Sequence, residues 1–175
     1  MIRSFEGKTP RIAASAFVSE AAYVVGDVEI GDNSCVWPGA VIRGDLGKIT
    51  IGRNTTIEDN CVIHSGSPTI PPEQDITIGD NVLFGHGAVS NGRKFGSNIL
   101  IGMNATILHD VEIGDYTVIA AGTVIKEQTI IPSRSFVAGV PGQIKGSIEP
   151  QHDYWFTKSP AIYKDLGKRY KKAGL

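Results

Sequence analysis

The sequence predicts a mainly β protein: a parallel β-helix of about six to seven triangular coils, followed by a C-terminal α-helix. Three observations support this fold class. Branched apolar residues recur every six positions, glycine often follows them, and the end of the chain changes to helical spacing. An amphipathic helix repeats its apolar residues every three to four positions and a half-buried strand every two, so a sustained hexad indicates a repeat architecture.

The hexad series covers most of the chain, and Ser90 is its one polar member. The slots are Ile12, Val18, Val24, Ile30, Val36, Ile42, Ile51, Ile57, Ile63, Ile78, Phe84, Ser90, Phe95, Ile101, Ile107, Ile113, Ile119, Ile125, Ile131 and Val137. Smaller residues such as Ala22, Ala40 and Cys61 stand four positions after a slot, where they can share the inside of a narrow coil. Three hexads then close one triangular coil.

Glycine directly follows several slots, as at Gly31, Gly52, Gly79 and Gly114, and Asp or Arg comes next. We interpret this pair as a corner that needs backbone freedom. Each hexad is therefore expected to supply one short strand and one corner.

Two insertions interrupt the count. Three extra residues lie within Arg43–Lys48, and nine lie between Ile63 and Ile78. The second insertion contains His64, Ser65, Gly66, Ser67, Pro68, Pro71, Pro72 and Asp75. Loops that interrupt a regular wall either contain functional residues or have no role beyond the corner they form. The spacing alone does not decide between these alternatives.

Length and composition indicate one elongated unit of 175 residues, with the β-helix over 1–146 and the helical segment over 147–175. A net charge of -1 gives no electrostatic reason to expect a nucleic acid or a membrane as partner. The first residues lack the apolar core of a secretion signal, so we expect a cytoplasmic protein. Cys35 and Cys61 fall on different walls and are expected to remain reduced thiols.

The segment from Glu149 onward has apolar residues at helical spacing, which predicts a helix with one apolar face. The residues of this face are Ile162, Tyr163, Leu166 and Tyr170. Ser159 and Pro160 suit an N-cap and the first helical position. Tyr154–Phe156 should form a shorter preceding turn. The helix is expected to pack along the prism or to cover a neighbouring subunit.

Counting hexads locates the polar groups. His64 and Asn91 each stand one residue after a slot and should be stacked one coil apart at the same corner, whereas Glu58 should lie beside His86 at another corner. A wall spans roughly 15 to 20 Å at ~3.3 Å per residue. Zinc–nitrogen bonds are only about 2.0 to 2.1 Å long, so His64 and His86 of one chain cannot share an ion. A second chain would have to bring its own corner alongside.

Several motifs stand at these corners: Arg43-Gly44-Asp45, the segment from Glu58 to His64, Ile78-Gly79-Asp80-Asn81, Gly85-His86-Gly87-Ala88-Val89, and Val137-Ala138-Gly139-Val140-Pro141-Gly142. Together they resemble the γ-class carbonic anhydrases and their relatives, from Met1 to the terminal helix. The resemblance implies a left-handed β-helix, a homotrimer, and a divalent metal at the subunit interface, with zinc first and iron or cobalt as alternatives. Three histidines hold the ion in that family. They match His64 and position 91 of one chain and His86 of the next.

Position 91 is Asn91 here, and an amide oxygen is a poorer zinc ligand than imidazole, so weaker binding or a preference for harder ions is expected. Glu58, at a place where the family usually has Gln, could complete the set as a ligand or accept a proton. By resemblance, Arg43 pairs with Asp45 between subunits and orients bicarbonate, and Asp59 supports that network.

The reaction implied is hydration of CO2 to bicarbonate by metal-bound hydroxide, the activity of a carbonic-anhydrase-like lyase. Two other functions remain open. A CoA-dependent hexapeptide acyltransferase would use His109 or His86 as general base, although the chain lacks the long protruding loop of those enzymes. The second alternative is a non-catalytic trimeric scaffold, and the presence of Asn91 favours it.

Overall fold

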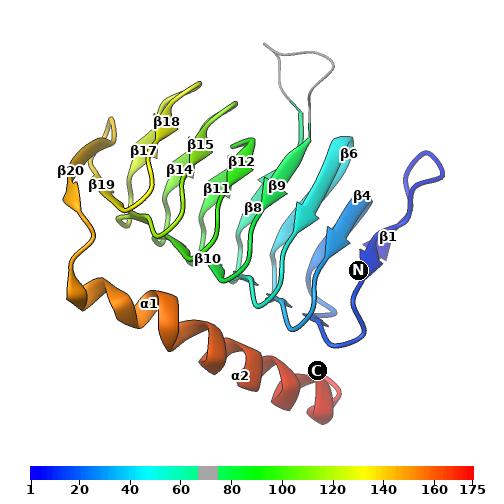
Figure 1. Cartoon of the computed structure of the whole chain (residues 1–175). Helices are drawn as coiled ribbons and strands as arrows, with labels where there is room; N and C mark the ends of the chain where they lie inside the picture. The colour runs from blue at the N-terminus through cyan, green and yellow to red at the C-terminus, as the bar shows by residue number, and fades with distance from the viewer. Residues whose placement is uncertain (67–74) are drawn as a thin grey trace.

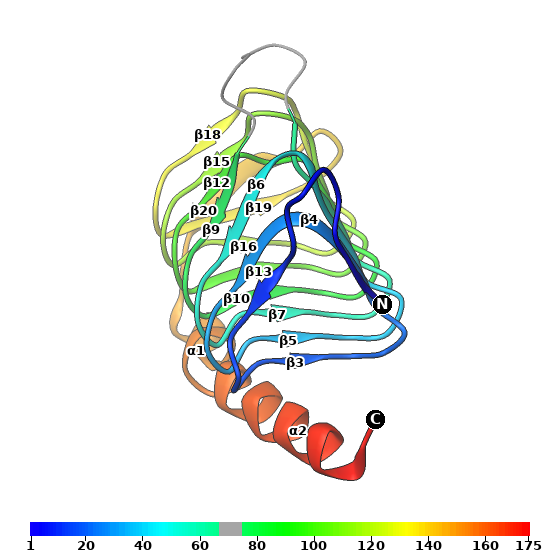
Figure 2. The ribbon, with the colours of Figure 1, turned by 90° about the vertical axis from the view of Figure 1, so that its right-hand side faces the viewer.

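The computed structural model describes residues 1–66 and 75–175. The chain forms a parallel β-solenoid of about seven turns, and a helical segment runs along its outside (Figure 1). The coils stack into three walls, and Figure 2 shows their three-sided outline. The predicted loop residues Ser67, Pro68, Pro71 and Pro72 lie outside the described residues.

Each wall is a ladder of short strands, and two long strands bend round a corner to serve two walls. Wall 1 contains β1 (Ile2–Arg3), the first parts of β4 (Tyr23–Ile30) and β6 (Val41–Ile51), β8 (Val62–His64), β11 (Val89–Ser90), β14 (Thr106–Ile107) and β17 (Val124–Ile125). Wall 2 contains β2 (Arg11–Ile12), the second parts of β4 and β6, β9 (Ile76–Ile78), β12 (Lys94–Phe95), β15 (Glu112–Ile113) and β18 (Ile130–Ile131). Wall 3 contains β3 (Phe17–Val18), β5 (Cys35–Val36), β7 (Thr56–Ile57), β10 (Val82–Phe84), β13 (Ile99–Ile101), β16 (Val118–Ile119), β19 (Ser135–Ala138) and β20 (Gln143–Ser147).

The hexad slots fill the inside of the coil, as predicted. Ile57, Phe84 and Ile101 stack in register on wall 3 and are fully buried. The polar slot Ser90 is also buried, and its hydroxyl accepts a hydrogen bond from the N–H of Gly92 at 3.1 Å. Burying a hydroxyl that has a hydrogen-bond partner costs little free energy, which explains how the series tolerates one polar member.

The glycines after the slots have a different role from the one expected. Gly31, Gly52 and Gly79 do not have positive φ; the left-handed residues are Asn33 and Asn54, two positions after Gly31 and Gly52. A Cβ on Gly31 would lie 2.6 Å from the carbonyl oxygen of Gly52, the same position in the next coil. Glycine is therefore needed for the close approach of stacked backbones, and asparagine makes the turn because it tolerates the left-handed region.

The first insertion is strand rather than loop. β4 and β6 pair on both sides of the corner, and the register shifts between Gly26 and Val28, so the extra residues form a bulge within continuous extended chain. Bulges bend a strand and redirect its side chains, and here the bulge carries Asp45. The insertion thus shapes a corner without leaving the wall.

The C-terminal segment folds as η1 (Pro150–His152), α1 (Asp153–Thr157) and α2 (Ser159–Ala173) and covers the outside of wall 3 (Figure 1). The predicted N-cap is wrong by one residue: Lys158 takes that place in right-handed helical conformation. Its N–H donates to the carbonyl of Tyr154, because the chain arrives already helical from α1. No helix among the described residues is long and apolar enough to cross a membrane.

An aromatic cluster docks α2. Phe17, Cys35 and Trp37 are buried beneath Tyr163, Leu166 and Tyr170, which confirms most of the predicted apolar face. Ile162 is the exception, because it remains 50% exposed and does not belong to this cluster. Both cysteines are free and buried, and burial raises the pKa of Cys35 to about 11 and that of Cys61 to about 12.

Candidate functional site

The first group of polar residues, which we call the His64 cluster, contains Arg43, Asp45, His64 and Asn91. Arg43 on β6 and His64 on β8 are in register. The His64 Nε2 atom lies 2.9 Å from Asp45 Oδ1 and 3.2 Å from an Arg43 guanidinium nitrogen. Burial raises the pKa of Asp45, but the hydrogen bond with His64 and the charge of Arg43 outweigh it and hold that pKa below its usual value.

The side-chain amide of Asn91 donates a hydrogen bond to the backbone carbonyl of His64 at 3.1 Å. This contact confirms that the two residues are stacked one coil apart at the same corner. It also fixes the orientation of the amide: the nitrogen is engaged, so the oxygen of Asn91 is the atom left for another partner.

The second group, the His86 cluster, contains Glu58, Asp59, His86 and Tyr163 and lies where wall 3 ends. The Glu58 Oε2 atom accepts the backbone N–H of His86 at 3.0 Å and lies 3.3 Å from His86 Nε2. The other ring nitrogen, Nδ1, lies 2.9 Å from Asp59 Oδ2. This geometry confirms the predicted neighbourhood of Glu58 and His86. When Asp59 accepts the Nδ1 proton of a neutral ring, Nε2 keeps the lone pair.

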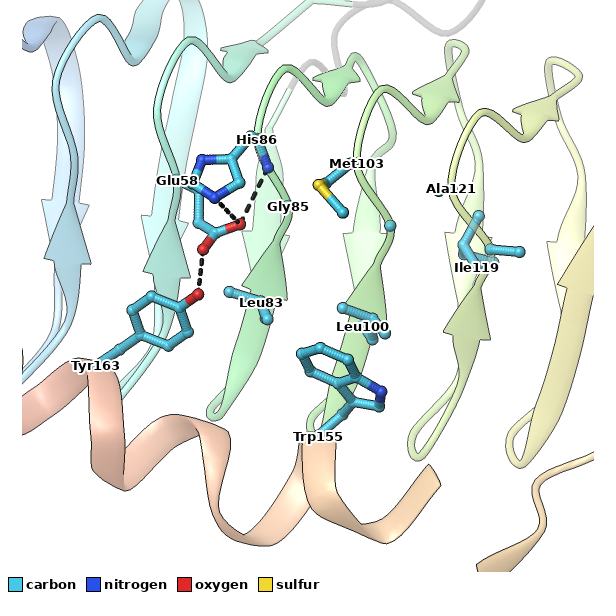
Figure 3. A pocket seen from close by; sticks show the side chains of 12 residues that line it. Glu58, Leu83, Gly85, His86, Leu100, Met103, Ile119, Ala121, Trp155 and Tyr163 are labelled. Atoms are coloured by element: carbon cyan, nitrogen blue, oxygen red, sulfur yellow. Dashed lines mark hydrogen bonds and ion pairs between the residues drawn. The ribbon is translucent and has the colours of Figure 1, made fainter. Parts of the chain in front are cut away.

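Tyr163 is a member that the sequence did not reveal. Its hydroxyl, on α2, donates to Glu58 Oε1 (Figure 3). Burial raises the pKa of Tyr163, and the hydrogen bond to Glu58 raises it further, so the hydroxyl stays protonated. Glu58 itself is only 4% exposed. No hexad count could find this contact, because Tyr163 is 105 residues away in a helix outside the repeat.

The two clusters remain separate within one chain. In the described parts of the chain, no three His, Cys, Asp or Glu side chains gather closely enough to hold a metal ion. Arg43 pairs with Asp45 at 3.1 Å inside the chain, where the resemblance implies a contact between subunits. Asp45 lies two residues after Arg43, at the start of the bulge in β6, and there its carboxylate stays within reach of the Arg43 guanidinium.

His109 belongs to neither cluster. Its Nδ1 atom lies 3.9 Å from Glu127, and its side chain is about one-third exposed. Among the described residues it makes no hydrogen bond or ion pair with Asn91 or His64, so it adds no ligand to their corner.

Family models match much of the solenoid. The model described as "Bacterial transferase hexapeptide (six repeats)" matches residues 9–44 and 94–127, and "Hexapeptide repeat of succinyl-transferase" matches residues 75–108. Both describe the repeat that forms the walls. They identify the architecture and say nothing about the two clusters.

Relatives that match most of the chain are more specific. "Probable carbonic anhydrase" of Methanocaldococcus jannaschii is 46% identical over 135 residues, which cover 76% of this chain and 80% of that protein. "Gamma carbonic anhydrase 2, mitochondrial" of Arabidopsis thaliana is 35% identical over 162 residues, covering 92% of this chain. The match spans 58% of that longer protein.

Solved structures agree on the fold. A hexapeptide transferase family protein from Anaplasma phagocytophilum superposes with a TM-score of 0.86 at 29% identity, and 97% of each chain is covered. The chain therefore belongs to the γ-carbonic-anhydrase-like family of hexapeptide-repeat proteins.

Proposed function

We propose that this chain is a trimeric γ-carbonic-anhydrase-like metalloprotein that hydrates CO2 at the interface between subunits. The observation that supports this most directly is the division of the site into two halves on one chain. His64 and His86 stand at different corners, and each is already oriented by a carboxylate, Asp45 or Asp59. Two half-sites of this kind make one complete site only where two copies meet.

The donor atoms suit a divalent ion. One half offers the imidazole of His64 and the amide oxygen of Asn91, and the other offers His86 Nε2 beside the carboxylate of Glu58. Imidazole and carboxylate are ligands that zinc, iron and cobalt accept. Carboxylates that accept a hydrogen bond from a ligating histidine fix its ring, as Asp59 does for His86. A bound divalent ion would lower the pKa of water to about 7.

The remaining residues would bind substrate and move protons. Arg43 belongs to the His64 cluster, and its guanidinium is partly exposed and would pair with bicarbonate. Asp45 holds Arg43 in place. Glu58, whose Oε1 is held by Tyr163, would accept a proton at Oε2 when that atom is released from His86.

A subunit-mixing experiment tests the shared site. His64→Ala and His86→Ala each damage every site of a homotrimer, so each variant alone should lose metal. Mixed trimers, refolded together from equal amounts, contain interfaces at which the intact His64 of one chain meets the intact His86 of the next. Random assembly restores about one quarter of the sites. Metal content by mass spectrometry and CO2 hydration by stopped flow should both recover to about that fraction of the unmutated protein.

The matched control is an equal mixture of His64→Ala with His64→Ala,His86→Ala, which cannot form a complete site. Trimer formation is checked by analytical ultracentrifugation in every sample. Recovery equal to that of the control, in mixtures proven to be trimeric, would contradict the shared site. Restored metal without CO2 hydration would support the metal centre and reject CO2 as the substrate.

A further inference from the structure

On the outer face of wall 3, the side chains become small in the coils that follow Glu58 of the His86 cluster. The slots Ile57, Phe84, Ile101 and Ile119 stack in register, so the residues that follow them form an outward row. From one coil to the next this row reads Trp37, Glu58, Gly85, Gly102 and Ala120. Two large side chains are thus followed by two glycines and an alanine.

This change leaves a groove of about 270 Å³ between the wall and the helical segment (Figure 3). Leu83 and Leu100 form one side, and Trp155 of α1 and Tyr163 of α2 rise against them from the helices. The exposed side chain of Met103 lies at the rim beside His86. The volume is slightly below the range of about 300–1,000 Å³ of small-molecule sites.

Backbone nitrogens of two lining residues, Met103 and Ala121, lie next to the positions at which this face lacks side chains. The side chain of Glu58 accepts a hydrogen bond from the backbone N–H of His86, which lies in the next coil. Gly85 and Gly102 have no side chain to do the same. A Cβ on Gly85 would lie 2.8 Å from the nitrogen of Met103, and one on Gly102 would lie 2.4 Å from the nitrogen of Ala121.

The N–H groups of Met103 and Ala121 donate to no acceptor in the described part of the chain. They stand in successive coils, about 4.8 Å apart along the stack. The groove therefore combines apolar walls with two free donors. Such donors are satisfied by water or by the oxygen atoms of a ligand.

We infer that the groove binds a neutral, carbonyl-bearing small molecule with a flat apolar body. The carbonyl oxygen would accept from the N–H of Met103 or Ala121, and the body would lie between Leu100 and Trp155. In the metal-stripped protein an anion fits less well, because the buried carboxylate of Glu58 lines the same groove. This inference goes beyond CO2 hydration and does not require a metal ion.

Acetanilide is a suitable probe, since it combines a phenyl ring with one neutral carbonyl. N-Ethylaniline has the same shape without the carbonyl oxygen, and benzoate carries a negative charge. We expect acetanilide to bind saturably, to shift the amide NMR signals of Met103 and Ala121, and to bind about five- to tenfold more tightly than either analogue. Equal affinity for acetanilide and N-ethylaniline would contradict the role of the donors, and no saturable binding would contradict the site.

Substitutions at Ala121 and Leu100 test the hydrogen-bond donors and the apolar walls of the groove separately. Ala121→Pro removes one N–H, and Ala121→Ser, its control, keeps the N–H and adds few atoms. Acetanilide affinity should fall about fivefold in the first and stay unchanged in the second. Leu100→Trp fills the groove and should abolish binding. The metal-stripped protein should bind as the untreated protein does, so failure of the metal site and failure of the groove give different results.

Discussion

At the scale of single residues, Asn91 stands where the family resemblance implies a third histidine ligand. Its amide nitrogen is occupied by the carbonyl of His64, so only its oxygen can face an ion. Amide oxygen is a harder and weaker donor than imidazole. The nature of this one side chain should therefore determine how tightly the protein holds metal.

Asn91→His is predicted to raise zinc affinity by at least about 10- to 100-fold, because changes in residues that only support a ligand already produce that range. The measurement is competition with a chromogenic chelator, followed by CO2 hydration at saturating zinc. Asn91→Gln, which keeps an amide, serves as control. If histidine and glutamine give the same affinity, position 91 does not face the ion.

Asp45 should make stability depend on pH in a defined direction. Its folded-state pKa is lowered, so its contribution is present above the unfolded pKa, near 3.9, and is lost as the pH falls through the folded value. Asp45→Asn should therefore lower the free energy of unfolding at pH 7, by about 1 kcal/mol at most because the pair is partly solvated. Urea unfolding at pH 7 and pH 3 should show this difference shrinking on acidification. If the difference in unfolding free energy is the same at both pH values, the effect of the substitution comes from another interaction, such as packing.

At the scale of elements, the docking of α2 governs the His86 cluster, because Tyr163 reaches Glu58 only when the helix is seated. Gly167 lies at the closest point of approach: a Cβ there would be 2.5 Å from Cys35 Sγ and 3.2 Å from Phe17 Cβ. The thiol of Cys35 in turn contacts the carbonyl of Tyr163 at 3.3 Å. The contact between helix and wall thus depends on the absence of one methyl group.

Gly167→Ala is predicted to destabilise the protein by about 1–3 kcal/mol, the cost of overpacking. In an exposed helix the same change stabilises by about 1 kcal/mol, so the sign itself is informative. Denaturant unfolding gives the free energy, and the reaction rate of Cys35 with a thiol reagent should rise as the helix lifts. Lys168→Ala, one residue away, is the control. A stabilised Gly167→Ala protein would show that α2 is not held this closely.

A repeat makes part of the candidate site predictable. The hexad count predicts that Asn91 stacks next to His64 and that Glu58 lies beside His86, because stacking in a solenoid converts sequence distance directly into position. It cannot place Tyr163, whose helix lies outside the repeat. It also assigns the corner glycines to turns, because the close approach of neighbouring backbones leaves no separate mark in the sequence.

At the scale of the whole molecule, each coil contacts only the coils above and below it. Stability is then a sum of coil and interface contributions, with the terminal coils least supported. The C-terminal end is closed by β20, which pairs antiparallel with β19 and interrupts the parallel ladder. Antiparallel pairing at this end covers an edge that would otherwise accept another chain. On wall 2, however, β18 is the last strand.

This arrangement predicts that identical core truncations will differ with their position along the stack. Ile101 is fully buried in β13 between two paired strands, whereas Ile131 lies in β18 and has a neighbour on one side only. Ile101→Ala should cost about 2–5 kcal/mol, because flanking coils prevent collapse of the cavity. Ile131→Ala should cost less, because a terminal coil can relax.

Urea unfolding, followed by the circular dichroism of the strands, measures both values. The slope of the transition provides a second readout, since fraying of the last coil before global unfolding would lower it in Ile131→Ala alone. Equal losses with unchanged slopes would mean that the seven turns unfold as one block. In that case the cooperative unit would be the whole prism, and the covering helix, which packs across several coils of wall 3, would be the element that joins them.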